Sequence, residues 1–355
     1  MLTIVYISLI LLGCVFEWPK GSKVFDCIVI ITLSYAVGSC TTHADYASYS
    51  MQYLTSAPTL NVFDEPLWKA LMCLFRSFGF SYNWFIALLT FIFMTLFLLG
   101  LRMLNLSTPF VWAMLLIYPG LMGLVQIRQL FAMIIAFLAF AYLLTAQKGR
   151  LFGYCCLVLI AGMVHVTAYF LLLVPFLKVF SRYKMILCVF VVALLISAFF
   201  SDWMLNLSQR LFVDDVSQAY LAGYGGVTNE LSRFFTVFEV IGTLLLLIVS
   251  RGAGASGKYD RAAYEYLLPI NLLFIAVIPL LMLNTDFLRL NRYVLLLNLI
   301  VLGSLSPLEN DAPSYSGNAK RIALRFAAVS FYGILFYCLV WMQAPDTVVG
   351  AILQW

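Results

Sequence analysis

The chain has 355 residues, of which 64% are hydrophobic and only 10% are charged, and its formal net charge is +5. Soluble domains average about 45–50% apolar and roughly 25% charged residues. A globule of this size could not bury such an apolar excess. The composition therefore excludes a secreted enzyme, a disordered chain and a nucleic-acid-binding domain, and it indicates an all-α polytopic integral membrane protein.

Apolar segments that approach the roughly 20 residues of a membrane-spanning helix follow one another through short connections. No internal repeat or separate soluble region interrupts them. We therefore expect one membrane-embedded domain over residues 1–355, a bundle of about 11–12 spanning or re-entrant helices. The predicted segments are residues 2–16, 24–42, 83–101, 108–125, 129–146, 151–177, 185–201, 234–250, 262–283, 293–307 and 322–343.

The Lys and Arg residues indicate which connections face the cytoplasm. With residues 43–82 and 202–233 as extracytoplasmic loops, 14 of the 21 basic residues fall inside and 7 outside. This distribution requires residues 151–177 to form a broken pair of helices, 151–164 and 166–177, because basic residues flank both ends. His165 would then lie near an extracytoplasmic apex. One straight span is the alternative.

Two polar clusters lie in the first predicted loop. Asp45 and Tyr49 are four residues apart, so one helical turn would place them on the same face. Glu65 precedes Pro66, and proline suits the first turn of a helix, whose positive end favours acidic side chains. This spacing predicts an interfacial or re-entrant helix to about residue 82. A solvated loop with aromatic residues at the membrane interface is the alternative.

Further polar residues lie beside or within apolar segments. Arg128, with Gln129 next to it, has almost no loop around it, and a guanidinium near hydrocarbon is normally paired or turned to a wet cavity. Arg289 and Arg292 are three residues apart, so they share a helical face on the side where basic residues are disfavoured. This pair indicates an anion site. The alternatives are arginines that reach the headgroups and, for His165, a bridge between helices.

These residue types suit a lipid-linked phosphate that carries a glycan. Arginine binds phosphate oxygens through two parallel hydrogen bonds, and tyrosine combines an apolar ring with a polar hydroxyl that suits sugars. The chain has no nucleotide-binding glycine loop. A donor already activated in the bilayer would make such a loop unnecessary.

The order of these motifs resembles the EpsG-like family of bacterial exopolysaccharide and O-antigen polymerases of the Wzy type. The resemblance covers about residues 20–305, with short motifs in a characteristic order. They are Asp45-Tyr46-x-x-Tyr49, Glu65-Pro66-Leu67, Arg128-Gln129 followed by Ala132, His165-x-Thr167 and Arg289-x-x-Arg292-Tyr293.

The resemblance implies a glycosyltransferase of the bacterial cytoplasmic membrane, with its active site facing the periplasm or exterior and an architecture related to the GT-C enzymes. A growing glycan on undecaprenyl pyrophosphate would move to the terminal sugar of an incoming lipid-linked repeat unit. Membrane lipid, a flippase and a chain-length regulator are the other expected partners. A flippase or transporter of lipid-linked oligosaccharides and a membrane O-acyltransferase are the alternative functions.

We assign each residue an expected role in this reaction. His165 is the preferred catalytic base, Asp45 is its rival and Glu65 is a third candidate. Fixed positive charge would stabilise the leaving pyrophosphate, so we expect neither a metal nor a cofactor. The pyrophosphate-binding residues are Arg128, Arg289 and Arg292, and the sugar-binding residues are Tyr46, Tyr49, Glu65 and Gln129.

Overall fold

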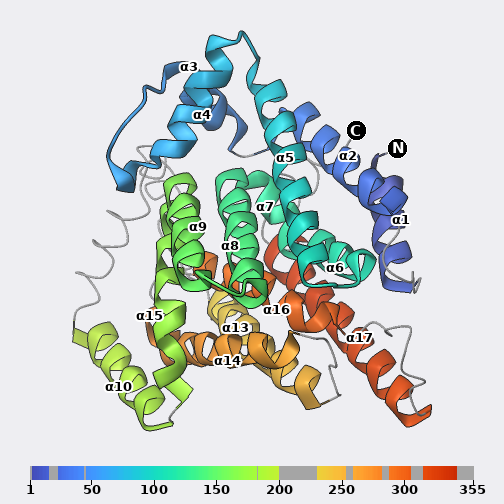
Figure 1. Cartoon of the computed structure of the whole chain (residues 1–355), viewed down its shortest axis with the longest axis vertical. Helices are drawn as coiled ribbons and strands as arrows, with labels where there is room; N and C mark the ends of the chain where they lie inside the picture. The colour runs from blue at the N-terminus through green and yellow to red at the C-terminus, as the bar shows by residue number, and fades with distance from the viewer. Residues whose placement is uncertain are drawn as a thin grey trace.

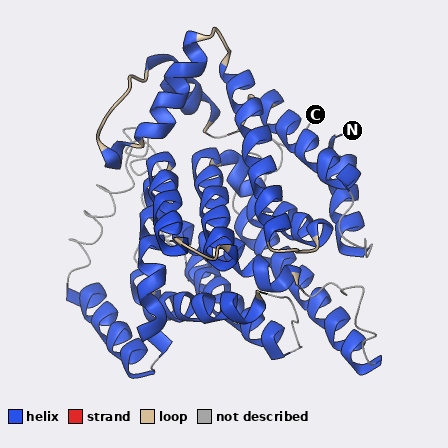
Figure 2. Cartoon of the chain, in the orientation of Figure 1, coloured by secondary structure: helices blue, strands red, loops and turns tan. Residues whose placement is uncertain are grey.

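The computed structural model describes residues 2–15, 23–43, 45–181, 183–199, 230–252, 259–281, 288–304 and 315–341. In these ranges nearly every residue is helical and none lies in a strand (Figure 2). Five of the described helices are long and apolar enough to cross a membrane, and four shorter apolar helices accompany them. The chain is therefore an all-α, multi-pass membrane protein. Of the predicted loop 202–233, only residues 230–233 are described.

The helices follow the predicted apolar segments closely, and the predicted loop 43–82 contains two further helices (Figure 1). The first half of the chain contains α1 (Leu2–Val15), α2 (Lys23–Ser39), α3 (Tyr46–Thr55), η1 (Val62–Asp64), α4 (Pro66–Ser77), α5 (Tyr82–Met103), α6 (Thr108–Leu115), η2 (Leu116–Gly120), α7 (Leu121–Val125) and α8 (Ile127–Thr145). The second half contains α9 (Arg150–Val164), η3 (Val166–Ser181), α10 (Tyr183–Phe199), α13 (Glu230–Gly252), α14 (Asp260–Ala276), α15 (Ile278–Leu281), α16 (Leu288–Gly303), α17 (Tyr315–Phe336) and η5 (Tyr337–Trp341).

Helix α8 lies between α5 and α9 and is largely buried along its length (Figure 1). Aromatic rings join it to α5. The Phe93 and Phe131 rings stack with centroids 4.3 Å apart, and Phe97 meets Phe137 edge to face at 4.7 Å. Interlocking aromatic pairs of this kind leave a helix little freedom to shift. The residues at the start of α8 are therefore held by the centre of the bundle.

Residues 151–177 form the broken pair that the basic residues predict. Helix α9 ends at His165, whose backbone is extended, with φ −151° and ψ 119°. The Tyr154 hydroxyl donates to the Leu171 carbonyl at 2.7 Å, although a straight helix would separate these residues by about 25 Å. The chain therefore doubles back at His165, and the straight-span alternative is wrong.

Residues 108–125 differ from the single helix that the sequence predicts. The segment is divided into α6, η2 and α7, and Tyr118 inside it has non-helical φ −164° and ψ 136° before a cis bond to Pro119. Irregular backbone at membrane depth is tolerated where protein surrounds it. Tyr118 is 1% exposed, so the break meets this condition.

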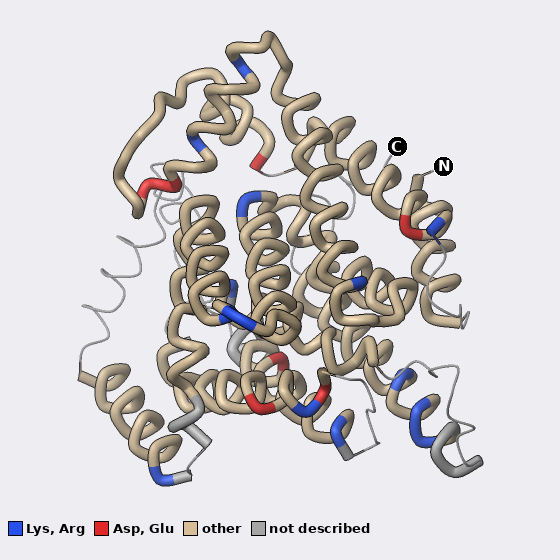
Figure 3. The backbone as a smooth tube through the Cα atoms, viewed as in Figure 1, with Lys and Arg blue, Asp and Glu red and all other residues tan. Residues whose placement is uncertain are grey.

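Different elements meet at the two ends of the bundle. At one end, the backbone N–H of Ser107 donates to the carbonyl of Gly303 at 3.3 Å, which joins the connection after α5 to the end of α16. At the other end, α3 and α4 lie across the tips of α8 and α9 (Figure 1). Charged positions are sparse along the central helices and gather toward helix ends (Figure 3).

Two glycines give a matched test of close helix packing. A Cβ on Gly13 of α1 would collide with the carbonyl oxygen of Pro109 in α6, whereas a Cβ on Gly333 of α17 would meet nothing within 4 Å. We expect Gly13→Ala to lower the free energy of unfolding by about 1–3 kcal/mol, because backbone must shift. Gly333→Ala should leave it unchanged or raise it by up to about 1 kcal/mol, because alanine forms helices more readily than glycine. Denaturation of both variants in detergent measures this; equal midpoints would contradict the α1–α6 packing.

Candidate active site

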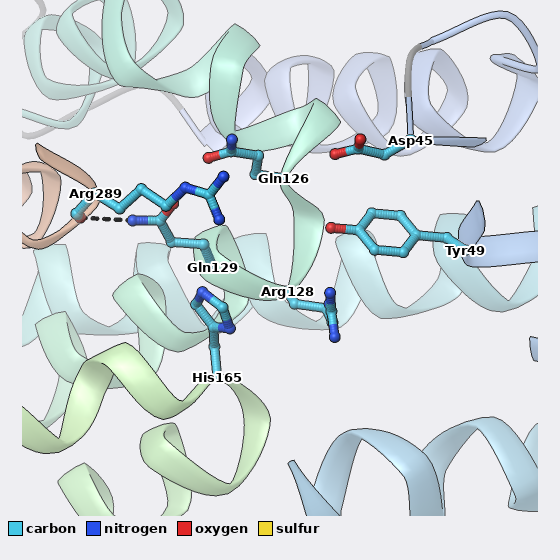
Figure 4. Close-up of a pocket in the computed structure, with 7 residues that line it drawn as sticks. All are labelled: Asp45, Tyr49, Gln126, Arg128, Gln129, His165 and Arg289. Carbon is cyan, nitrogen blue, oxygen red and sulfur yellow. Dashed lines mark hydrogen bonds between the residues drawn. The ribbon is translucent and has the colours of Figure 1, made fainter. Parts of the chain in front are cut away.

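One pocket gathers most of the residues that the sequence predicts for the site. Its volume is about 40 Å³. A water molecule needs roughly 10–15 Å³ of such space, so the pocket has room for only a few waters. The lining residues are Asp45, Tyr49, Gln126, Arg128, Gln129, His165 and Arg289 (Figure 4).

The lining comes from helix ends that are far apart in the sequence. Residues 45–81, which contain α3, η1 and α4 and which we call the cap, contribute Asp45 and Tyr49. The bundle contributes the junction of α7 and α8, the break at His165 and the start of α16. The starts of α3, α8 and α16 therefore meet here, and helix N-termini favour negative charge.

Glu65 links the cap to the bundle. Its Oε2 accepts a hydrogen bond from Arg128 Nη1 at 2.5 Å, and its Oε1 lies 2.5 Å from His165 Nδ1. The Glu65 backbone is left-handed, with φ 50° and ψ 56°. Non-glycine residues in this region carry strain of order 1–3 kcal/mol and keep it where their surroundings enforce it. The two contacts on the carboxylate supply such enforcement.

The Glu65 carboxylate also determines which ring nitrogen of His165 carries the proton in the neutral imidazole. Burial by itself would raise the Glu65 pKa. The charges of Arg128 and His165 and their hydrogen bonds outweigh burial and lower the pKa from 4.5 to about 2. Glu65 is therefore ionised at neutral pH and can only accept hydrogen bonds. The carboxylate accepts from Nδ1–H, so in the neutral form of the ring the single proton lies on Nδ1 and Nε2 is the acceptor. This is the arrangement of an oriented general base.

The opposite wall of the pocket combines a carboxylate with an aromatic ring. The Tyr49 N–H donates to the Asp45 carbonyl at 2.9 Å, so one helical turn puts both residues on the same side, as their spacing predicts. The Arg128 guanidinium lies 4.9 Å from the centroid of the Tyr49 ring. Burial raises the Asp45 pKa, and Arg289 and Arg128 partly counteract that rise. In Figure 4, Asp45 and Tyr49 face Arg289 across the pocket.

The acidic and basic side chains around the pocket are divided between the cap and the bundle. The two carboxylates, Asp45 and Glu65, belong to the cap, whereas the two guanidiniums, Arg128 and Arg289, belong to the bundle. Gln129 donates from Nε2 to the Arg289 backbone carbonyl at 2.6 Å and so ties α8 to α16. Opposite charges thus meet where the cap rests on the bundle.

Three predicted site residues lie outside the pocket lining: Glu65, described above, Tyr46 and Arg292. The Tyr46 hydroxyl donates to Asn83 Oδ1 at 2.7 Å and joins the cap to α5. Arg292 lies behind the pocket, where its Nη1 donates to Gln126 Oε1 at 2.5 Å. The structure thus brings together Asp45, Tyr49, Arg128, Gln129, His165 and Arg289, with Glu65 bound to two of them.

The structure also places residues to which the sequence assigned no role. Gln126 lines the pocket, and the buried Glu239 of α13 lies near Arg292. A carboxylate inside an apolar segment is a recognisable signal, because such residues are rare and usually functional. Within the described ranges, no group of three or more His, Cys, Asp and Glu side chains is placed to hold a metal ion.

The acid response of stability tests the Glu65 contacts. Because the folded-state pKa of Glu65 is below its usual 4.5, its contribution is present above that pH and is lost as the pH falls toward 2. We expect Glu65→Gln to lower the thermal midpoint in detergent at about pH 6, and this deficit to shrink as the pH approaches about 3. Asp64→Asn, at a more exposed neighbour, is the control. A deficit independent of pH would contradict the assignment.

The comparisons with known proteins agree with the motif order. The EpsG family matches residues 23–349, nearly the whole chain. A search of curated proteins and a search of solved structures each found no match. The family implies a polymerase-type function in exopolysaccharide biosynthesis, which fits a multi-pass membrane bundle. The chain belongs to the EpsG family.

Proposed function

We propose that this protein is a polyprenyl-pyrophosphate-dependent glycosyltransferase that polymerises lipid-linked repeat units at the outer face of the bacterial cytoplasmic membrane. The growing glycan moves from undecaprenyl pyrophosphate to the terminal sugar of an incoming lipid-linked unit. The observation that carries this proposal is the convergence of Arg128, Arg289 and a carboxylate-bound His165 on one pocket. A relation to the GT-C architecture is part of the same proposal.

The reaction forms one bond and breaks one bond. The acceptor hydroxyl oxygen attacks the anomeric carbon of the donor glycan, and the bond from that carbon to the pyrophosphate oxygen breaks. His165 Nε2 takes the hydroxyl proton, and the pyrophosphate leaves with the electron pair. Once the cap has closed again over the bound substrates, Glu65 lies on Nδ1 through Oε1, where it orients the ring and stabilises the imidazolium that forms.

The two pocket arginines stabilise the negative charge of the leaving group. Fixed positive charge in a poorly hydrated site stabilises developing negative charge more than it could in water. Arg128 and Arg289 approach from α8 and α16, and both are anchored by contacts to the bundle or the cap. A pyrophosphate would replace the cap carboxylates as their counter-charge.

The size of the pocket adds a condition to this mechanism. A volume of about 40 Å³ admits a few waters but neither a sugar nor a diphosphate. The cap therefore has to move away from the bundle for substrates to enter. Arg76 of α4 donates to the carbonyls of Tyr53 at 2.8 Å and Ser56 at 2.8 Å, so α3 and α4 are joined and can move together.

Loss of a pocket arginine should stop polymerisation. We expect Arg128→Ala and Arg289→Ala to leave single repeat units at the surface and to lower the transfer rate by about 10²–10³, because an anion-stabilising donor is lost. Electrophoresis of surface glycans measures chain length. Arg261→Ala, at a side chain that is 90% exposed on α14, is the control. Full-length polymer from either pocket variant would remove the anion-site assignment.

The base assignment has a separate test. We expect His165→Ala to lower the transfer rate by about 10²–10⁴, the usual contribution of a general base. Glu65→Gln should have a smaller effect, because the ring stays but loses its charged partner. Transfer by reconstituted protein is the measurement. Wild-type rates in His165→Ala would assign the base to Asp45, which faces the same pocket.

A deletion strain separates the proposed function from its alternatives. Single repeat units on the surface indicate a lost polymerase, and no surface glycan indicates a lost flippase. Long glycan without its modification indicates a lost O-acyltransferase. We expect single units, and either other phenotype would overturn the polymerase assignment.

A further inference from the structure

A second group of polar residues lies behind the pocket, inside the bundle. Glu239 of α13 is completely buried, and both of its carboxylate oxygens have partners. Asn291 Nδ2 of α16 donates to Oε1 at 2.8 Å, and the Tyr118 hydroxyl donates to Oε2 at 3.2 Å. With Arg292, these residues form what we call the inner cluster. It joins α13 and α16 to the non-helical break at Tyr118.

Arg292 connects the inner cluster to the pocket wall. On one side, its guanidinium is close enough to Glu239 and to the Tyr118 hydroxyl to interact electrostatically with both. On the other side, Nη1 lies 2.5 Å from Gln126 Oε1 and 3.4 Å from Gln129 Oε1. Arg292 therefore contacts two residues that line the pocket without lining it itself.

The contact with Arg292 determines which end of the Gln126 amide faces the pocket. A guanidinium has five N–H donors and no acceptor, so a neighbouring amide must turn its oxygen toward it. The Gln126 Nε2 is then directed away from Arg292. Gln126 lines the pocket at the non-helical junction of α7 and α8, so an amide turned away from Arg292 can direct its two N–H donors to a group bound there. Donors of this kind suit an anion.

Stability alone does not account for the inner cluster. A buried ion pair is often no more stabilising than apolar residues of similar size, and ionisable residues inside membranes are costly and usually functional. Asp26 provides a contrast, because it is equally buried but pairs with the half-exposed Arg102 at 3.2 Å and with Trp112 at 3.0 Å. None of these three residues lines the pocket.

We propose that Gln126 contacts the substrate diphosphate and that Arg292 and Glu239 are positioning residues that hold its amide in the donating orientation. This inference rests on the proposed function, since it assigns a diphosphate to the pocket. The sequence suggests that Arg292 binds the phosphate directly. In this proposal Arg292 instead contacts Gln126, which contacts the substrate.

Binding of farnesyl diphosphate to the full-length protein in nanodiscs tests the contact. We expect Gln126→Ala to weaken binding by about 10- to 100-fold, the usual effect of losing a hydrogen bond to a charged group. Glu239→Gln, which keeps the size of the side chain, should weaken binding by a smaller factor. Asp26→Asn is the matched control for a buried carboxylate and should bind like wild type.

The double variant distinguishes positioning from general structural support. If Glu239 acts through Gln126, then Glu239→Gln combined with Gln126→Ala binds no more weakly than Gln126→Ala alone. Factors that multiply, or a Glu239→Gln variant that loses thermal stability but keeps wild-type affinity, would overturn the positioning role. Wild-type affinity in Gln126→Ala would overturn the contact and leave the proposed function standing. Failure of the wild-type protein to bind the diphosphate would overturn both.

Discussion

The Glu65 carboxylate is the contact on which the candidate site depends. One oxygen engages Arg128 and the other engages His165, so a single cap residue holds together the start of α8 and the end of α9. The strained backbone at Glu65 shows that the surroundings, rather than local preference, determine its conformation. Without this contact, the packing of Trp68 against Phe131 and the Tyr46–Asn83 hydrogen bond would still hold the cap, but Arg128 and His165 would lose their shared partner.

The sequence predicts the helices well because each depends on a continuous apolar run, and it predicts local geometry where residues are one turn apart. Asp45 with Tyr49 and the helix start at Pro66 are of this kind. The reversal at His165 is predicted because basic residues flank both ends of residues 151–177, and basic residues indicate which ends face the cytoplasm.

Other features depend on contacts between distant segments, and no spacing in the sequence reveals them. Residues 65 and 165 are 100 positions apart, and neither has a periodic pattern that points to the other. Arg289 and Arg292 differ by about 60° around their helix, enough for one to enter the pocket and the other to lie behind it. The break at Tyr118 does have a local signal in Pro119-Gly120, but the continuous apolar run around this pair favours a single helix.

The separation of charge between cap and bundle has a consequence for the reaction cycle. Acids on one part and guanidiniums on the other attract each other most strongly when no other anion is present. In the proposed reaction, an incoming diphosphate would compete for the same cations and weaken the adhesion of the cap, so the substrate itself would loosen the closure that excludes it. Departure of the spent carrier would restore the attraction and return the cap to the bundle, so the empty site would close by itself between turnovers.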